Sequence, residues 1–202
     1  LESIRKDREL RDIPVLMVTT QAEKEVVMET AEIMVDGYLL KPLTPKALEE
    51  KINDIIRHLN EPDQATQHVR TSRYFEETGD LKKAIRQMEA AVALKPGASR
   101  LIRQLGLLHQ KIGNLPLMEN YLSKAAAINP HDAVSRYLLA RHFGNTGDWE
   151  YATRYFLEVI ALTSRFNDAA IEFGTALMSQ NQAGHAERLF ESIIFQSSSD
   201  IK

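Results

Sequence analysis

Two polar side chains follow directly after short apolar runs in the first quarter of the chain. Val15 to Val18 predicts a short strand that is buried on both faces, and Thr19 comes immediately after it. A second short strand is predicted over residues 38–40, and Lys41 comes at its end. In parallel sheets the carboxyl ends of the strands carry the chemistry. The sequence therefore places a hydroxyl and an ammonium group at the functional edge of a predicted sheet.

Helices must connect and follow these strands for that edge to form. An amphipathic helical stretch opens the chain over residues 1–10, and a second helix is predicted over residues 23–35. Thr44 and Pro45 then predict an N-cap and a first helical turn, for a helix over residues 45–60. Strand, helix, strand and helix in this order form a right-handed parallel crossover unit.

The first 59 residues resemble the C-terminal part of a response-regulator receiver domain. The resemblance rests on PVLMVTT, with its strand-end hydroxyl, and on DGYLLKPLTPKALEEKI, with its aromatic residue, Lys-Pro pair and final helix. It implies a flavodoxin-like fold in which Thr19 bonds an aspartyl phosphoryl group, Lys41 pairs with that group and Tyr38 changes rotamer. A sensor kinase is the implied partner of the complete protein.

The family's phosphorylated aspartate and its magnesium-binding acidic pair lie in strands that these residues do not include. We therefore expect no phosphoryl transfer and no cofactor in this chain. Magnesium is expected only together with the missing N-terminal part of the receiver.

From residue 65 onward a 34-residue period replaces the strand pattern. Gly-Asp or Gly-Asn pairs begin at residues 79, 113 and 147, and Asn181 falls at the next step. Small residues recur in the same register, at Ser72, Gly106, Ala140 and Gly174, and at Ala84, Ala152 and Ala186, whereas Met118 departs from the second of these columns. Small residues let two helices approach closely, and glycine permits the turn between them. The pattern resembles the tetratricopeptide repeat (TPR).

Four TPR units are expected, over residues 65–98, 99–132, 133–166 and 167–200, after a linker at 60–64. The predicted fold class is mainly α, with a partial α/β receiver fragment over residues 1–59 followed by an α-solenoid of about four helical hairpins.

A TPR array implies a concave groove lined by the first helix of each unit. Arginine is the commonest side chain expected there in the first three units, and the candidate partner-binding residues are Arg73, Arg100, Arg103, Lys111, Tyr137 and Arg141. The other positions expected in the groove are Val69, Glu76, Ile171 and Thr175. Guanidinium groups bind carboxylates and phosphoryl groups through paired hydrogen bonds. The set therefore favours an acidic or phosphorylated protein segment as partner. The alternative is that these residues are ordinary solvated helix charges.

Composition and motifs argue against several other function classes. The chain of 202 residues has a net charge of -3 and no cysteine, which excludes disulfide scaffolds and thiol catalysis. It has no glycine-rich phosphate loop and no HExxH pair, so we expect no enzyme. His109 shares a repeat column with Phe75, which favours packing over metal binding. A basic middle, with 10 Lys or Arg against 6 Asp or Glu over residues 65–132, gives only weak support for nucleic acid.

We therefore expect a cytoplasmic two-component response regulator whose TPR module binds a protein partner, with binding linked to receiver phosphorylation. The alternative is a constitutive scaffold with a degenerate, structural receiver part. No apolar run is long enough for a membrane span. The edge of the predicted sheet and the apolar last helix also predict that the natural chain continues or that this chain forms a homodimer.

Overall fold

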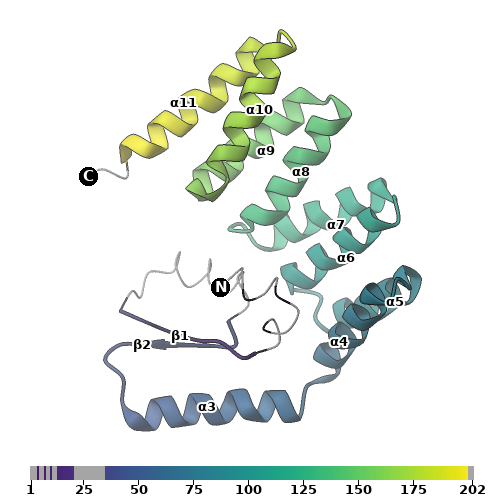
Figure 1. The fold of residues 1–202 in the computed structure, drawn as a ribbon, viewed down its shortest axis with the longest axis vertical. Coiled ribbons are helices and arrows are strands. Elements are labelled where there is room, and N and C mark those ends of the chain that lie inside the picture. Colours follow the sequence, from purple (N-terminus) through teal and green to yellow (C-terminus); the bar gives the residue numbers. More distant parts are fainter. Residues whose placement is uncertain (1–3, 5–6, 8–9, 11–12, 21–34, 200–202) are drawn as a thin grey trace. The chain divides into compact units, whose positions relative to one another are not determined.

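The computed structural model describes residues 4, 7, 10, 13–20 and 35–199 of the chain (Figure 1). The chain forms two compact units, residues 1–71 and residues 72–202. The helices expected over residues 1–10 and 23–35 fall almost entirely outside the described residues.

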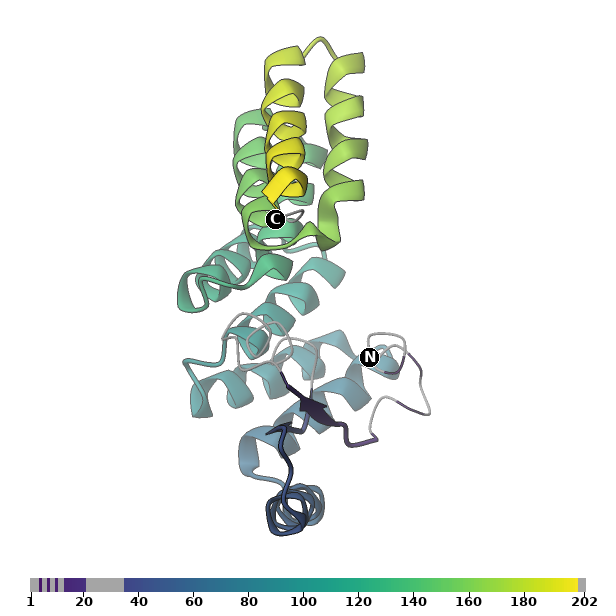
Figure 2. The same ribbon diagram turned by 90° about the vertical axis from the view of Figure 1, so that its left-hand side faces the viewer.

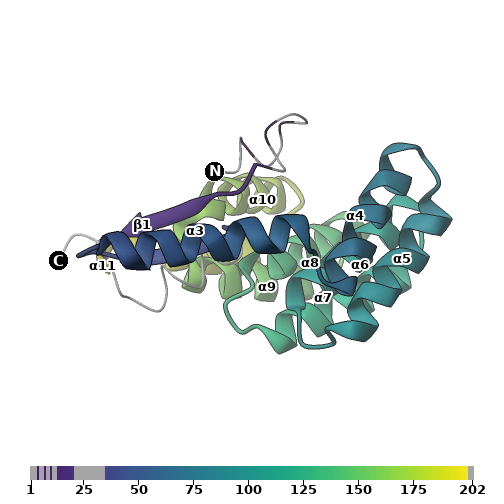
Figure 3. The same ribbon diagram turned by 90° about the horizontal axis from the view of Figure 1, so that it is seen from below.

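The first unit contains a parallel pair of strands. Strand β1 (Leu16–Thr19) pairs with β2 (Gly37–Leu40), and Leu16 lies opposite Gly37. Helix α3 (Pro45–Asn60) runs along these strands (Figure 3). A Cβ atom on Gly37 would lie only 2.8 Å from Leu16 Cδ1 and 2.9 Å from Ile55 Cδ1. Glycine therefore allows the strand to approach the α3 side chains closely.

Helix α3 has the predicted start and end. The Thr44 hydroxyl oxygen accepts a hydrogen bond from the Ala47 backbone N–H at 3.2 Å, and Pro45 is the first helical residue. This cap satisfies one of the backbone donors that a helix start leaves free.

Antiparallel helices follow one another through the rest of the described chain (Figures 1 and 2). Their bounds are α4 (Gln64–Glu77), α5 (Leu81–Leu94), α6 (Ser99–Lys111), α7 (Leu115–Ile128), α8 (Ala133–Thr146), α9 (Trp149–Leu162), α10 (Asn167–Ser179) and α11 (Ala183–Ser199), with a short 3-10 turn, η1 (Ser164–Phe166), before α10. Helix α4 begins at the last residue of the predicted linker, and the boundary between the compact units falls within it. The predicted domain limits stay a prediction.

The turns between paired helices share one backbone feature that recurs every 34 residues. A residue with positive φ occupies each turn, namely Gly79 (83°), Gly113 (75°), Gly147 (81°) and Asn181 (60°). Asparagine tolerates this left-handed region better than most residues with a side chain. This tolerance explains how the last hairpin turns without glycine.

The compact repeat columns lie where paired helices touch. Ala84, Met118, Ala152 and Ala186 are all completely buried. A Cβ atom on Gly174 would lie 2.8 Å from the ring of Phe190, so this position accepts no larger residue without a shift. Met118 departs from the small-residue pattern, and it packs against Leu122 and Leu139.

Candidate functional site

Thr19 and Lys41 are neighbours at the carboxyl edge of the strand pair. The Lys41 backbone N–H donates to the Thr19 carbonyl at 2.8 Å, and Tyr38 lies opposite Met17 in the register. The structure thus brings together the two strand-end residues that the sequence singled out. The phosphoryl-switch roles of Thr19, Tyr38 and Lys41 stay a prediction. Among the described residues, no group of three His, Asp or Glu side chains could hold a metal ion.

Arg103 was expected to line the partner-binding groove, but the structure places its side chain in the interior. Its side chain is 8% exposed, and its guanidinium contacts the carboxylate of Asp132, which is completely buried. Asp132 also accepts hydrogen bonds from the backbone N–H and the hydroxyl of Ser135, at 2.9 and 2.6 Å. Arg103 is therefore a structural group inside the protein, because its charge is already neutralised in a buried ion pair.

The other cations of the predicted set have different surroundings. Lys111 Nζ lies 2.6 Å from Glu76 Oε1 in a partly exposed ion pair. Arg73 and Arg100 are half-buried on α4 and α6. None of these three side chains lines the groove that contains the remaining two members of the set.

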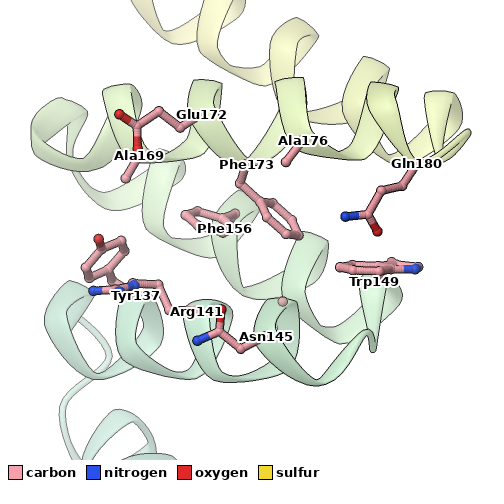
Figure 4. A pocket seen from close by; sticks show the side chains of 11 residues that line it. Tyr137, Arg141, Asn145, Trp149, Phe156, Ala169, Glu172, Phe173, Ala176 and Gln180 are labelled. Atoms are coloured by element: carbon pink, nitrogen blue, oxygen red, sulfur yellow. The ribbon is translucent and has the colours of Figure 1, made fainter.

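Tyr137 and Arg141 line a groove of about 500 Å³ between the first helices of the third and fourth hairpins (Figure 4). The volume is in the range of small-ligand and peptide pockets. Helices α8 and α10 form its two walls, and aromatic side chains form its floor. The lining residues are Tyr137, Arg141, Gly144, Asn145, Trp149, Phe156, Ala169, Glu172, Phe173, Ala176 and Gln180.

The aromatic floor holds its shape through ring contacts. Phe156 stacks on Phe173 with a centroid distance of 4.9 Å, and Trp149 lies 6.3 Å from Phe173. Tyr137 stacks on Phe166 at 4.4 Å, which fixes one end of the groove. Aromatic pairs of this kind stabilise a site beyond their buried area. The floor residues therefore support one another without a ligand.

One cation and one anion face the same end of the groove. Figure 4 shows Arg141 on α8 and Glu172 on α10, both pointing toward the end marked by Tyr137 and Ala169. The Arg141 guanidinium lies over the Tyr137 ring at 5.8 Å. In the part of the chain that the structure describes, neither Arg141 nor Glu172 forms an ion pair. Both charges can therefore meet a ligand.

Sequence reasoning missed most of this lining. Asn145 lies one helical turn after Arg141, and Glu172 lies on the first helix of the next unit, so helical spacing could have indicated both. Gln180 directly follows that helix. Trp149 opens α9, a second helix, and no pattern of first-helix positions includes it.

His109 is a packing residue, as its repeat column predicted. It is 6% exposed, and its ring stacks on Tyr121 with a centroid distance of 5.3 Å. Burial lowers the pKa of His109, and the nearby charge of Glu89 opposes this shift. The imidazole is therefore held in its neutral form inside the hairpin.

Two comparisons with known proteins found matches. Over 59 residues the chain is 44% identical to the chemotaxis protein CheY-3 of Vibrio cholerae serotype O1, covering 29% of this chain and 45% of that protein. Over 60 residues it is 42% identical to the chemotaxis protein CheY of Pseudomonas aeruginosa, covering 30% of this chain and 48% of that protein. The chain thus spans less than half the length of these curated relatives. No protein-family model matches it.

Solved structures match about three quarters of the chain. MamA aligns with a TM-score of 0.56 at 17% identity, covering 77% of this chain and 94% of that one. YrrB, described as a TPR protein with an unusual peptide-binding site, aligns with a TM-score of 0.52 at 20% identity, covering 75% of this chain and 78% of that one. At these identities the likeness shows the fold. The chain therefore joins a segment homologous to CheY-like receivers, over its first 30%, to an α-solenoid of TPR hairpins.

Proposed function

We propose that this chain is the interaction part of a response regulator, and that the groove between α8 and α10 binds a segment of a protein partner. The observation that carries the proposal is the groove itself. It combines an aromatic floor with the charges of Arg141 and Glu172, which have no ion-pair partner among the described residues. The aromatic residues also belong to the hydrophobic core of these helices, whereas the charges of Arg141 and Glu172 add nothing to that core and suit a binding surface.

The proposed partner presents an acidic group to Arg141. Arg103 cannot serve, because Asp132 already neutralises it, and Lys111 is paired with Glu76. The sequence suggested a partner segment that is acidic or phosphorylated. With Arg103 and Lys111 already paired, the proposed segment needs to bind only one cation of this chain, Arg141. The role is non-catalytic and cytoplasmic in this proposal. None of the helices among the described residues is long and apolar enough to cross a membrane.

We further propose that receiver phosphorylation changes partner binding in a chain whose receiver is whole. The support is the homology to CheY-like receivers and the adjacency of Thr19 and Lys41 at one sheet edge. A sensor kinase and magnesium would then act on the whole receiver. The second candidate is a constitutive scaffold, in which phosphorylation leaves partner affinity unchanged.

A peptide-display selection on the purified chain tests groove binding. Selected peptides should lose most of their affinity for an Arg141→Glu variant and keep it for Arg86→Glu, a matched reversal at an exposed arginine outside the groove. Equal loss in both variants, or in neither, would place the contact elsewhere.

The phosphorylation link needs the chain with its whole receiver. The affinity of a selected peptide is measured with and without acetyl phosphate and magnesium. A change that disappears in a Lys41→Ala variant supports the switch, whereas an unchanged affinity supports the constitutive scaffold.

A further inference from the structure

We propose that the groove recognises an extended segment of about four residues, with one acidic side chain, one basic neighbour and a large apolar side chain close by. This inference rests on the proposed function, because it names the class of peptide that the groove between α8 and α10 takes. It differs from a purely acidic or phosphorylated ligand in requiring both signs of charge.

The walls set the length of the segment. Tyr137 and Asn145 mark the two ends of the α8 wall and are eight residues apart in the sequence. At about 1.5 Å rise per helical residue, this wall is about 12 Å long. An extended chain rises about 3.3 Å per residue, so the wall accommodates about four residues.

The two charges set the polarity of the segment. Arg141 and Glu172 come from opposite walls and point toward the same end of the groove (Figure 4). A ligand with two acidic groups there would gain from Arg141 and be repelled by Glu172. Successive side chains of an extended segment point to opposite sides. An acidic residue next to a basic one can therefore meet Arg141 on one wall and Glu172 on the other.

Small residues leave room for one large apolar side chain beside the charged end. Ala169 and Ala176 line the groove without filling it, and the rings of Phe156 and Phe173 lie beneath. A Cβ atom on Gly144 would lie 2.9 Å from Phe173 Cε2. Glycine at this position thus lets the Phe173 ring lie against α8 and keeps the aromatic floor in place.

Two carboxamides can hold the backbone of the segment. Asn145 points from α8 into the groove, and Gln180 lies at the end marked by Trp149 (Figure 4). A carboxamide both donates and accepts hydrogen bonds, as a peptide group requires. Backbone binding of this kind fixes the position of the segment and leaves the choice of sequence to the charges and the apolar subsite.

The single tryptophan of the chain makes the test direct. Trp149 lines the groove, so its emission reports occupancy without a label. Three capped seven-residue peptides are titrated into the full chain. The first contains aspartate, lysine, alanine and phenylalanine in this order between glycines, the second replaces the lysine by aspartate, and the third replaces the phenylalanine by alanine.

We expect saturable changes in Trp149 emission with the first peptide. The second should bind about fivefold more weakly through loss of one partly exposed ion pair and repulsion by Glu172. The third should bind at least about tenfold more weakly through loss of the apolar anchor. In a Glu172→Arg variant the two-acid peptide should become the tighter ligand. Glu187→Arg, an exposed position on α11 outside the groove, should leave the order unchanged.

The outcomes separate this inference from the proposed function. If the two-acid peptide binds wild type as tightly as the first, or if Glu172→Arg leaves the order unchanged, the charge rule is overturned while groove binding stands. If none of the three peptides alters Trp149 emission but a display-selected peptide does, the inference fails and the proposed function survives. If selected peptides also leave Trp149 emission unchanged and bind the Arg141→Glu variant as tightly as the wild type, both fail.

Discussion

Replacing Arg103 by alanine should strongly destabilise the helical repeats. Asp132 is completely buried and would lose the cation that neutralises it, keeping only its hydrogen bonds from Ser135. Removing one partner of a buried ion pair costs about 3–5 kcal/mol. Lys111→Ala is the matched control, because the Lys111–Glu76 pair is partly exposed and should contribute about 0.2–1 kcal/mol.

The repeat itself supplies a replacement for the ion pair. One 34-residue step after Arg103 and Asp132 come Tyr137 and Phe166, whose rings stack at 4.4 Å. The double variant Arg103→Tyr, Asp132→Phe should therefore recover most of the stability lost in Arg103→Ala. It should still lack about 1 kcal/mol, since Asp132 also caps the start of α8 by accepting from the Ser135 backbone N–H.

Urea denaturation followed by Trp149 emission and by circular dichroism measures these free energies of unfolding. The reasoning would be refuted if Arg103→Ala lost no more stability than Lys111→Ala. A double variant as unstable as the single one would refute the equivalence of the ion pair and the ring stack.

Three further predictions address the turns, a buried histidine and the receiver-like edge. Gly113→Ala should lower the free energy of unfolding by about 1–2 kcal/mol, because Gly113 has a φ of 75° and a Cβ atom there would meet no other atom within 4 Å. Thermal unfolding measures this loss, and an unchanged melting temperature would contradict backbone strain as its cause. Burial lowers the pKa of His109, so the unfolded chain takes up its proton first as pH falls below about 6.5. Stability should therefore decrease from pH 7 to pH 5, and urea midpoints of His109→Phe should decrease less; an identical decrease would exclude His109 as the source. Incubation with acetyl phosphate and magnesium should add no phosphoryl mass to this chain, because Thr19 and Lys41 can only assist a phosphoryl group that another residue carries. Intact-mass measurement tests this, and a stoichiometric adduct would disprove it.

Local backbone chemistry explains why the helices and turns could be predicted. Gly79, Gly113 and Gly147 adopt the positive φ that their column required, and Asp80 caps the following helix by accepting from the Lys83 backbone N–H. The hydrogen bond from the Lys83 side chain is the largest cause of the lowered pKa of Asp80, and the hydrogen bond from the Lys83 backbone N–H lowers this pKa further. These interactions join residues no more than a few positions apart, so the sequence order already contains them.

The lining of the groove could be predicted only in part, because it combines residues from one helix with residues that are distant in the sequence. Tyr137 and Arg141 are on the first helix of a hairpin, which the repeat register identified. Trp149 and Phe156 reach the same groove from the following helix, and Glu172 reaches it from the next hairpin. These side chains lie in one groove only because of the way that α8, α9 and α10 pack together. The spacing of residues within a single helix does not contain this information.

By itself the sequence determined the strand-end positions of Thr19 and Lys41, the start of α3 at Pro45 and the 34-residue succession of hairpins, because each depends on local sterics, capping or side-chain period. Only the tertiary structure decided which charged residues face a ligand. Arg103 and Tyr137 occupy equivalent repeat positions, yet Arg103 is buried because Asp132, 29 residues further along, neutralises it. Arg141 has no such partner among the described residues. A guanidinium is stable in the interior when a buried carboxylate pairs with it, and otherwise it stays at the surface, where it can bind.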